Sequence, residues 1–176
     1  MEQPPALLIH GFTGGTFELE PLSELLDERG IQAHLPEMPW SGERLVKRNK
    51  ESWEDWLSEV TSYTNRFACE HSQFDLVGFS LGGMAAAYLA NRFPVRRLVL
   101  VNAAVIYVSP VRFIIDSPKH AGFDCTSHSA VYIDRHIQAP SHIYTYEQSN
   151  HQLCLGPEKD LAIAHIVEFL ERREGS

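Results

Sequence analysis

Gly78-Phe79-Ser80-Leu81-Gly82 decides the fold of this chain, because it stands between a strand-forming run, residues 74–77, and a run of small, helix-forming residues. The pattern Gly-x-Ser-x-Gly is typical of a sharp turn from a strand into a helix. Side chains at its glycine positions would collide with the neighbouring strand and helix. A serine on such a turn projects its hydroxyl out of the fold, with the positive end of the helix dipole behind it. The motif therefore predicts that Ser80 is a nucleophile.

The composition is that of an ordinary globular protein. Of the 176 residues, 44% are hydrophobic and 22% are charged, so we expect residues 1–176 to form a single domain. The net charge of −8 argues against a nucleic acid or an anionic membrane as partner. The densest basic clusters, residues 47–50 and the pair Arg96-Arg97, are short, and we expect them to be solvated surface.

The cysteines suggest no cross-linked or metal-bound scaffold. Cys69, Cys125 and Cys154 are widely spaced and form no Cys-x-x-Cys pair, so neither a disulfide framework nor a zinc site is expected. Residues 1–5 carry no basic region and the apolar run behind them stops at Ile9, which favours neither a signal peptide nor a membrane span. These features predict a cytoplasmic protein with no metal and no cofactor.

Short β-rich runs alternate with helical patterns along the chain. Strands are expected at residues 6–9, 31–35, 74–77, 97–101 and 142–146. Helices are expected from Pro21 to a cap at Gly30, from Ser52 with Trp53 and Trp56 packed on the sheet, and over residues 81–92, 130–137 and 160–171. Residues 111–115 are a further possible strand. This alternation implies βαβ units, hence an α/β fold with a mostly parallel sheet and helices on both faces.

A serine hydroxyl is a weak nucleophile unless a base takes its proton. In hydrolases with such a turn, the acid and then the histidine follow the serine, on loops after later strands. His151 fits the base best, because it lies in a polar loop, residues 147–151, between the expected strand 142–146 and the last helix.

Three aspartates between Ser80 and His151 are candidates for the carboxylate that orients the base. Asp134 belongs to an expected helix and is more simply a solvated carboxylate. Asp116 follows an apolar run that could be a strand, whereas Asp124 lies in a loop-like stretch ahead of the helix. We favour Asp124 over Asp116.

An oxyanion requires two backbone N–H donors, one from the residue after the nucleophile and one from the loop after an early strand. Leu81 and Phe12 occupy those two positions. His10 is expected to hold the loop by packing and hydrogen bonding rather than to take part in catalysis.

Three motifs together resemble a known family. Residues 10–14 read His-Gly-Phe-Thr-Gly, residues 78–83 read Gly-Phe-Ser-Leu-Gly-Gly, and residues 146–151 end in Ser-Asn-His. In this order they are similar to motifs of the α/β-hydrolase superfamily, specifically of bacterial carboxylesterases and monoacylglycerol lipases. The resemblance covers residues 6–108 and resumes from about residue 120.

The resemblance implies hydrolysis of a small-molecule ester through an acyl-serine. Ser80 would be the nucleophile, His151 the base, and Phe12 and Leu81 the oxyanion donors. The stretch that ends at Asp124 resembles the family's His-Gly-x-x-Asp acid segment, which supports Asp124.

One departure from the family is the region before the acid. Members usually place a cap and another helix there, whereas only a short stretch joins Val101 to Asp124, so the cap is expected to be reduced or missing. Because caps commonly supply the walls of an acyl pocket, an open site favours short to medium acyl chains. The same departure leaves a second hypothesis, a catalytically impaired binding protein in which Ser80 is unreactive.

A metal site is the third class that we considered. His120, Asp124 and His128 recur every four residues and would share one helix face. Gly122 and the nearby Pro118 argue against a helix there, so we do not expect a metal.

Overall fold

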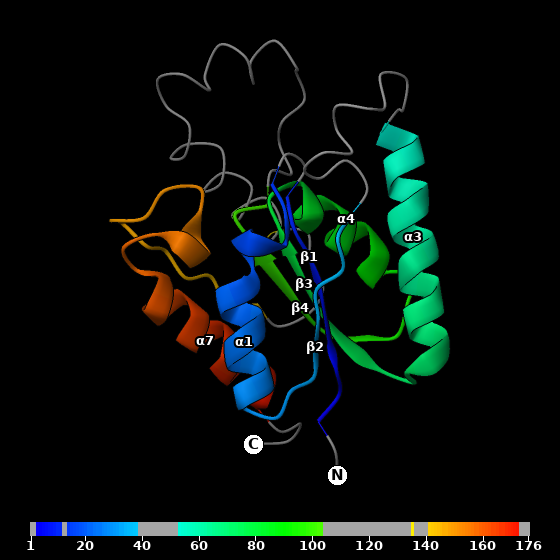
Figure 1. Ribbon diagram of the computed structural model, residues 1–176, viewed down its shortest axis with the longest axis horizontal. Coiled ribbons are helices and arrows are strands. Elements are labelled where there is room, and N and C mark those ends of the chain that lie inside the picture. The colour runs from blue at the N-terminus through cyan, green and yellow to red at the C-terminus, as the bar shows by residue number, and fades with distance from the viewer. Residues whose placement is uncertain (1–2, 12–13, 39–52, 104–134, 136–140, 173–176) are drawn as a thin grey trace.

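The fold is a parallel sheet between two layers of helices. A computed structural model describes residues 3–11, 14–38, 53–103, 135 and 141–172. Its four strands are all parallel and lie in the order β2-β1-β3-β4 (Figure 1). They are β1 (Ala6–Ile9), β2 (Ala33–His34), β3 (Phe74–Phe79) and β4 (Val95–Val101). The prediction of an α/β fold with a parallel sheet is confirmed.

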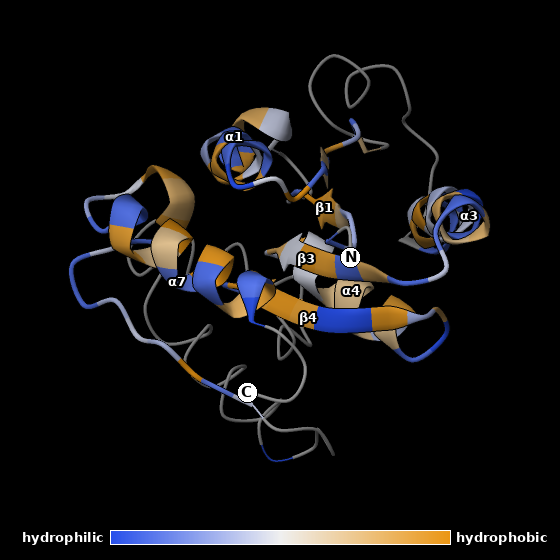
Figure 2. Ribbon diagram, turned by 90° about the horizontal axis from the view of Figure 1, so that it is seen from below, coloured by the Kyte–Doolittle hydropathy of each residue, from blue (hydrophilic) through white to orange (hydrophobic). Residues whose placement is uncertain are grey.

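Helices cover both faces of this sheet. They are α1 (Glu20–Glu28), α3 (Trp53–Glu70), α4 (Leu81–Ala90) and α7 (Lys159–Glu171), with single turns of 3-10 helix at η1 (Thr16–Glu18) and η2 (Leu153–Leu155). Figure 2 shows α1 and α7 on one side of the strands and α3 and α4 on the other. Each side has its own apolar core, and β1 and β3 contribute side chains alternately to the two cores. Such two-sided burial explains why these strands are almost continuously apolar.

The first helix, Glu20–Glu28, begins one residue before the predicted Pro21 and ends two residues before Gly30. Pro21 lies in its first turn, where its missing N–H costs nothing. Leu22 and Leu26 are fully buried against the sheet. Gly30 follows the helix with φ of +78°, a conformation that glycine adopts without strain.

The long helix α3 packs one apolar face on the sheet. Trp56 is only 1% exposed and lies in the core with Val60 and Phe67. The expectation that Trp56 packs on the sheet is confirmed. Ser52, where this helix is expected to begin, lies outside the described residues.

The expected strand at residues 142–146 is wrong. The chain there forms no ladder, and His142, Ile143, Tyr144 and Thr145 are exposed. The aromatic side chains contact α7 instead: the Tyr144 ring stacks on His165 at 4.5 Å, and the Tyr146 hydroxyl lies 2.9 Å from His165 Nδ1. A β-rich pattern becomes a strand only when a neighbouring strand accepts its hydrogen bonds.

The expectation that Arg96 is solvated surface is also wrong. Its side chain is 9% exposed and binds the fully buried Asp75, with Arg96 Nε donating to Asp75 Oδ1 at 2.8 Å. Arg96 Nη2 and Arg97 Nη1 both donate to the carbonyl oxygen of Leu170 in α7, at 2.9 and 3.1 Å. The two arginines therefore join the start of β4 to the C-terminal helix.

The second strand is shorter than expected, residues 33–34 rather than 31–35. Several other expectations fall outside the described residues: the basic cluster 47–50, the possible strand 111–115, and all of the expected helix 130–137 except the helical Arg135. Among the described helices, none is long and apolar enough to cross a membrane.

Candidate active site

Ser80 sits on a strained turn between β3 and α4. Its φ of 55° and ψ of −118° lie in a region that residues with a side chain rarely adopt. The turn is held on both sides, because Ser80 N–H donates to Val101 O and Gly83 N–H donates to Ser80 O, each at 3.0 Å. Helix α4 begins at the next residue, so the positive end of its dipole lies behind the serine.

Glycines make this turn possible. A Cβ on Gly78 would meet the Cβ of Ala86 at 2.7 Å and collide with the carbonyl of Gly82. A Cβ on Gly82 would lie 2.6 Å from the carbonyl oxygen of His10 and would collide with the carbonyl oxygen of Ile9. The glycines thus allow α4 to start directly against β3 and the end of β1, as the motif predicts.

His151 approaches the serine from the C-terminal part of the chain. Its Nε2 lies 2.9 Å from Ser80 Oγ, a hydrogen-bond distance across 71 positions of sequence. The imidazole packs against the Phe79 ring, with 5.1 Å between centroids. Burial lowers the pKa of His151 below its usual value, which favours the neutral imidazole that accepts a proton.

The loop that carries His151 is anchored by Asn102, a residue that our sequence reasoning missed. Asn102 directly follows β4 with φ of 47°, and its Nδ2 donates to the carbonyl oxygen of His151 at 2.7 Å. The missed signal is an asparagine directly after a strand, since asparagine tolerates positive φ better than most residues. Further along, Glu158 accepts hydrogen bonds from Gln148 N–H at 2.8 Å and Ser149 Oγ at 3.0 Å.

The loop after β1 passes close to the serine. A Cβ on Gly11 would lie 3.4 Å from the Cβ of Ser80, at van der Waals contact. His10 is fully buried; its Nδ1 donates to the carbonyl oxygen of Gly11 at 2.8 Å and its Nε2 accepts from Met38 N–H at 2.9 Å. Burial lowers the pKa of His10, consistent with a neutral ring that holds the loop.

The structure brings together some of the predicted site residues. Ser80 and His151 are in contact, and Leu81 is the first residue of α4. Phe12, the other expected oxyanion donor, and Asp124, the expected acid, lie outside the described residues. So do the other two candidate acids, Asp116 and Asp134.

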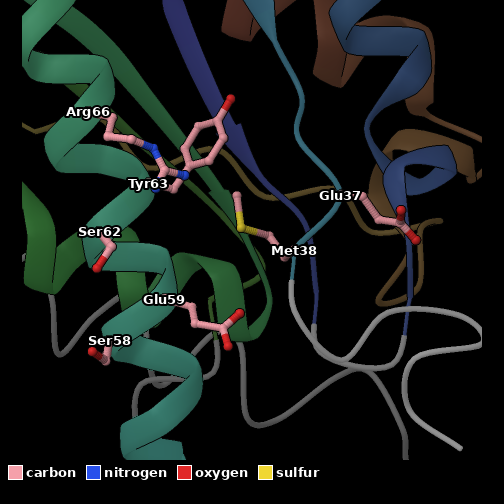
Figure 3. A pocket seen from close by; sticks show the side chains of 7 residues that line it. All are labelled: Glu37, Met38, Ser58, Glu59, Ser62, Tyr63 and Arg66. Atoms are coloured by element: carbon pink, nitrogen blue, oxygen red, sulfur yellow. The ribbon is translucent and has the colours of Figure 1, made fainter. Parts of the chain in front are cut away.

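A separate hollow of about 290 Å³ lies between α3 and the segment after β2. Figure 3 shows its lining, which is mainly polar and includes Glu37, Glu59 and Arg66 but neither Ser80 nor His151. In the part of the chain that the structure describes, no cluster of histidine, cysteine or acidic side chains could hold a metal ion. The candidate metal residues His120, Asp124 and His128 lie outside that part.

With this geometry in place, comparison with known proteins identifies the family. The family model described as "Alpha/beta hydrolase family" matches residues 6–164. The chain belongs to this family. The resemblance seen in the three sequence motifs is thereby confirmed, and the short interval between β4 and the His151 loop is consistent with a reduced cap in this α/β hydrolase.

Two relatives are esterases or lipases. The chain is 32% identical over 96 residues to a carboxylesterase of Bacillus subtilis, and 30% identical over 100 residues to a thermostable monoacylglycerol lipase of a Bacillus species. These matches cover 53% and 56% of this chain but only 38% and 40% of the relatives. The matched part therefore spans about two fifths of each relative's length.

Solved structures show the same fold over nearly the whole chain. A structure from the work on the metagenome-derived lipolytic enzymes LipS and LipT has a TM-score of 0.79 at 17% identity and covers 98% of this chain and 95% of its own. A putative hydrolase from Xanthomonas campestris has a TM-score of 0.68 at 16% identity, covering 97% and 99%. At these identities the similarity establishes the α/β-hydrolase fold alone.

Proposed function

We propose that the protein is a serine hydrolase that cleaves carboxylic esters with short to medium acyl chains. The observation that carries the proposal is the 2.9 Å contact between Ser80 Oγ and His151 Nε2 on a strained turn. The relatives named as a carboxylesterase and a monoacylglycerol lipase support the choice of ester bonds. The short interval between β4 and the His151 loop supports the choice of shorter acyl chains, because a reduced cap would leave fewer apolar walls for a long one.

In the first half of the reaction, Ser80 attacks the ester carbonyl. His151 Nε2 takes the hydroxyl proton as the Ser80 Oγ–carbon bond forms, and the carbonyl oxygen becomes an oxyanion. The N–H groups of Phe12 and Leu81 stabilise that oxyanion, and Asp124 orients the imidazolium. His151 then returns the proton to the leaving alcohol as the ester C–O bond breaks, which leaves an acyl-serine.

In the second half, water replaces the alcohol. His151 takes one proton from water as its oxygen attacks the acyl carbon, and the same donors stabilise the second oxyanion. The bond to Ser80 Oγ breaks, Ser80 recovers its proton from His151, and the carboxylic acid leaves. One ester and one water thus give one acid and one alcohol, and the enzyme is regenerated.

The test compares the wild-type protein with Ser80→Ala on a series of p-nitrophenyl esters, from acetate upward in chain length. We expect hydrolysis by the wild-type protein, fastest on the short and medium esters, and no activity above background for Ser80→Ala. A fluorophosphonate probe should label the wild-type protein at Ser80 and leave the variant unlabelled. Asp124→Asn and Asp116→Asn, assayed side by side, identify the acid by the larger loss of kcat.

Equal rates for both proteins, with Ser80 unlabelled, would overturn the proposal. That outcome would support the other hypothesis from the sequence, an impaired hydrolase-like binding protein with an unreactive Ser80. A wild-type protein that hydrolysed only long-chain esters would contradict the acyl range and leave the esterase assignment standing.

A further inference from the structure

Glu18 is a buried acidic residue that the proposed mechanism does not use. It is 7% exposed, and its Oε2 accepts a hydrogen bond from the Gly11 N–H at 3.1 Å. Burial raises the pKa of its carboxyl group, and the bond from Gly11 opposes that effect. Because burying a carboxyl group costs free energy, its place beside Gly11, in the loop after β1, requires a reason.

The loop after β1 packs against this carboxyl group at two points. A Cβ on Gly11 would lie 3.1 Å from Glu18 Oε2, and a Cβ on Gly14 would overlap the carboxyl group itself. Gly14 does not have a positive φ, so it is the position of Glu18 rather than the backbone conformation that excludes a side chain there. Gly11 and Gly14 therefore both pack closely against one side chain.

The same loop also borders the nucleophile. The Cβ position of Gly11 lies 3.4 Å from the Cβ of Ser80 and 3.4 Å from Phe79 Cδ1. Gly11 thus lies between the carboxyl group of Glu18 and the catalytic serine. The residue that follows Gly11 in the chain is Phe12, whose N–H is the proposed second donor to the oxyanion.

We infer that Glu18 is a positioning residue, whose carboxyl oxygen holds the Gly11 amide and so fixes the backbone beside Ser80, one residue before the proposed oxyanion donor, the Phe12 N–H. The inference rests on the proposed function, because it assigns Glu18 a part in that site. This positioning role requires the acceptor oxygen of Glu18 and not its negative charge, since an ionised carboxylate near the oxyanion would oppose the charge that develops there. A neutral side chain of the same shape that keeps an acceptor oxygen should therefore serve as well.

The test compares Glu18→Gln with Glu18→Met. Glutamine keeps the shape and an acceptor oxygen, whereas methionine keeps the approximate length and removes the acceptor. We expect Glu18→Gln to retain kcat within about threefold of the wild type. Glu18→Met should lose about 10- to 100-fold in kcat with little change in KM, because displacement of an oxyanion donor acts on the transition state.

Two further measurements separate positioning from folding. Thermal unfolding should show that Glu18→Met is folded at the assay temperature, although loss of the acceptor for the Gly11 N–H should lower its melting temperature relative to Glu18→Gln. Affinity for an alkyl boronic acid, which forms a tetrahedral adduct with the serine, should fall in Glu18→Met in parallel with kcat. Glu24→Ala, an exposed acid on the neighbouring helix α1, is the matched control and should change neither property.

Gly14→Ala disturbs the same contact from the opposite side and keeps Glu18. Its added methyl group would occupy the place of the carboxyl group, so we expect a loss of kcat of similar size with an unchanged KM. If Glu18→Met fails to fold, Gly14→Ala alone decides the question.

The outcomes distinguish this inference from the function on which it rests. An active wild type, with Glu18→Met or Gly14→Ala as fast as Glu18→Gln, would overturn the role of Glu18 and leave the hydrolase proposal intact. A wild-type protein that neither hydrolyses esters nor reacts at Ser80 would overturn both.

Discussion

Strand β3 has a buried ion pair near its first residue and a strained serine just after its last. Near the start, Asp75 is fully buried and bonded to Arg96, which also bonds the carbonyl of Leu170. After the end, Ser80 holds an unfavourable backbone conformation with its hydroxyl turned to His151. Near the start of β3, hydrogen bonds between polar groups join β3, β4 and α7. At the other end, tight glycine packing imposes a strain that directs a side chain outward. Stability and chemistry should therefore respond to different substitutions on the same strand.

The largest expected effect comes from Ser80→Gly. This variant removes the proposed nucleophile and, because glycine tolerates positive φ, also removes the strain of the turn. We expect kcat/KM for an ester to fall by at least about 10⁴-fold. The free energy of unfolding should rise by about 1 kcal/mol or more, since strained non-glycine residues cost about that much.

Ser80→Ala is the matched control for this variant. It should abolish activity equally but keep the strain, so chemical denaturation should find it less stable than Ser80→Gly. Equal stability of the two variants would show that the turn stores no strain.

The next effect is at the other end of β3. Arg96→Met leaves the Asp75 carboxylate buried without its partner, and we expect it to lower the free energy of unfolding by about 3–5 kcal/mol. The exposed pair between Arg29 and Glu171 provides the comparison: Arg29→Met should cost less than about 1 kcal/mol. Both values can be measured by urea denaturation.

This loss of stability should not be accompanied by a loss of catalytic activity. At a temperature where Arg96→Met is folded, its kcat should lie within about twofold of the wild type, because Arg96 lies near the start of β4 and Ser80 beyond the end of β3. A large fall in kcat of the folded variant would show that the two ends of the strand are coupled.

A smaller effect is expected from Asn102→Gly. Glycine accepts the positive φ at this position, so the variant removes the hydrogen bond to the His151 carbonyl without straining the backbone. Loss of one such bond is worth about 1 kcal/mol, which corresponds to a fall in kcat of about fivefold. Asn102→Asp, which has the shape but not the N–H donor, should lose a similar amount. Full activity in both variants would contradict an anchoring role for Asn102.

The smallest effect concerns pH. His151 must be neutral to accept the serine proton, so activity is lost as the pH falls through its pKa. Because burial lowers this pKa from the usual 6.5, we expect the acid limb of kcat/KM to have its midpoint below pH 6.5. The measurement uses release of 1-naphthol from 1-naphthyl acetate across the acid range. A midpoint at or above 6.5 would show that charge interactions outweigh burial.

Much of the fold could be predicted because the spacing of apolar residues along its strands and helices matches the faces that are buried. Strand β1 has the predicted bounds, and the helix 160–171 differs from α7 by one residue at its start. The prediction of a strand at residues 142–146 is wrong because a strand forms only beside a partner strand, and the pattern of one segment does not show whether a partner is present. The prediction that Arg96 is solvated is wrong for a similar reason, since its carboxylate partner, Asp75, is 21 positions away.

The residues of the candidate site likewise fall into those that a sequence pattern predicts and those that it does not. The serine turn could be found because glycine spacing is a local steric requirement, and His151 could be found from its order in the chain. Asn102 and Glu18 were missed: an asparagine directly after a strand hints at a positive φ, but the hydrogen-bond partner of each side chain, a backbone group 49 and 7 positions away, cannot be identified from the sequence. Such contacts leave no periodicity and no motif. Ser80, His151, Asp124, Phe12 and Leu81 all remain predictions as functional groups.

The 71-position separation of Ser80 and His151 has a consequence for synthesis of the protein on the ribosome. Strands β1, β3 and β4 and helices α1, α3 and α4 all precede residue 102, so the serine turn can assemble while the rest of the chain is still being made. His151 and the α7 carbonyl that binds Arg96 and Arg97 are translated later. The nascent chain would then carry its serine without a base, and reactivity would appear only when the last helix docks.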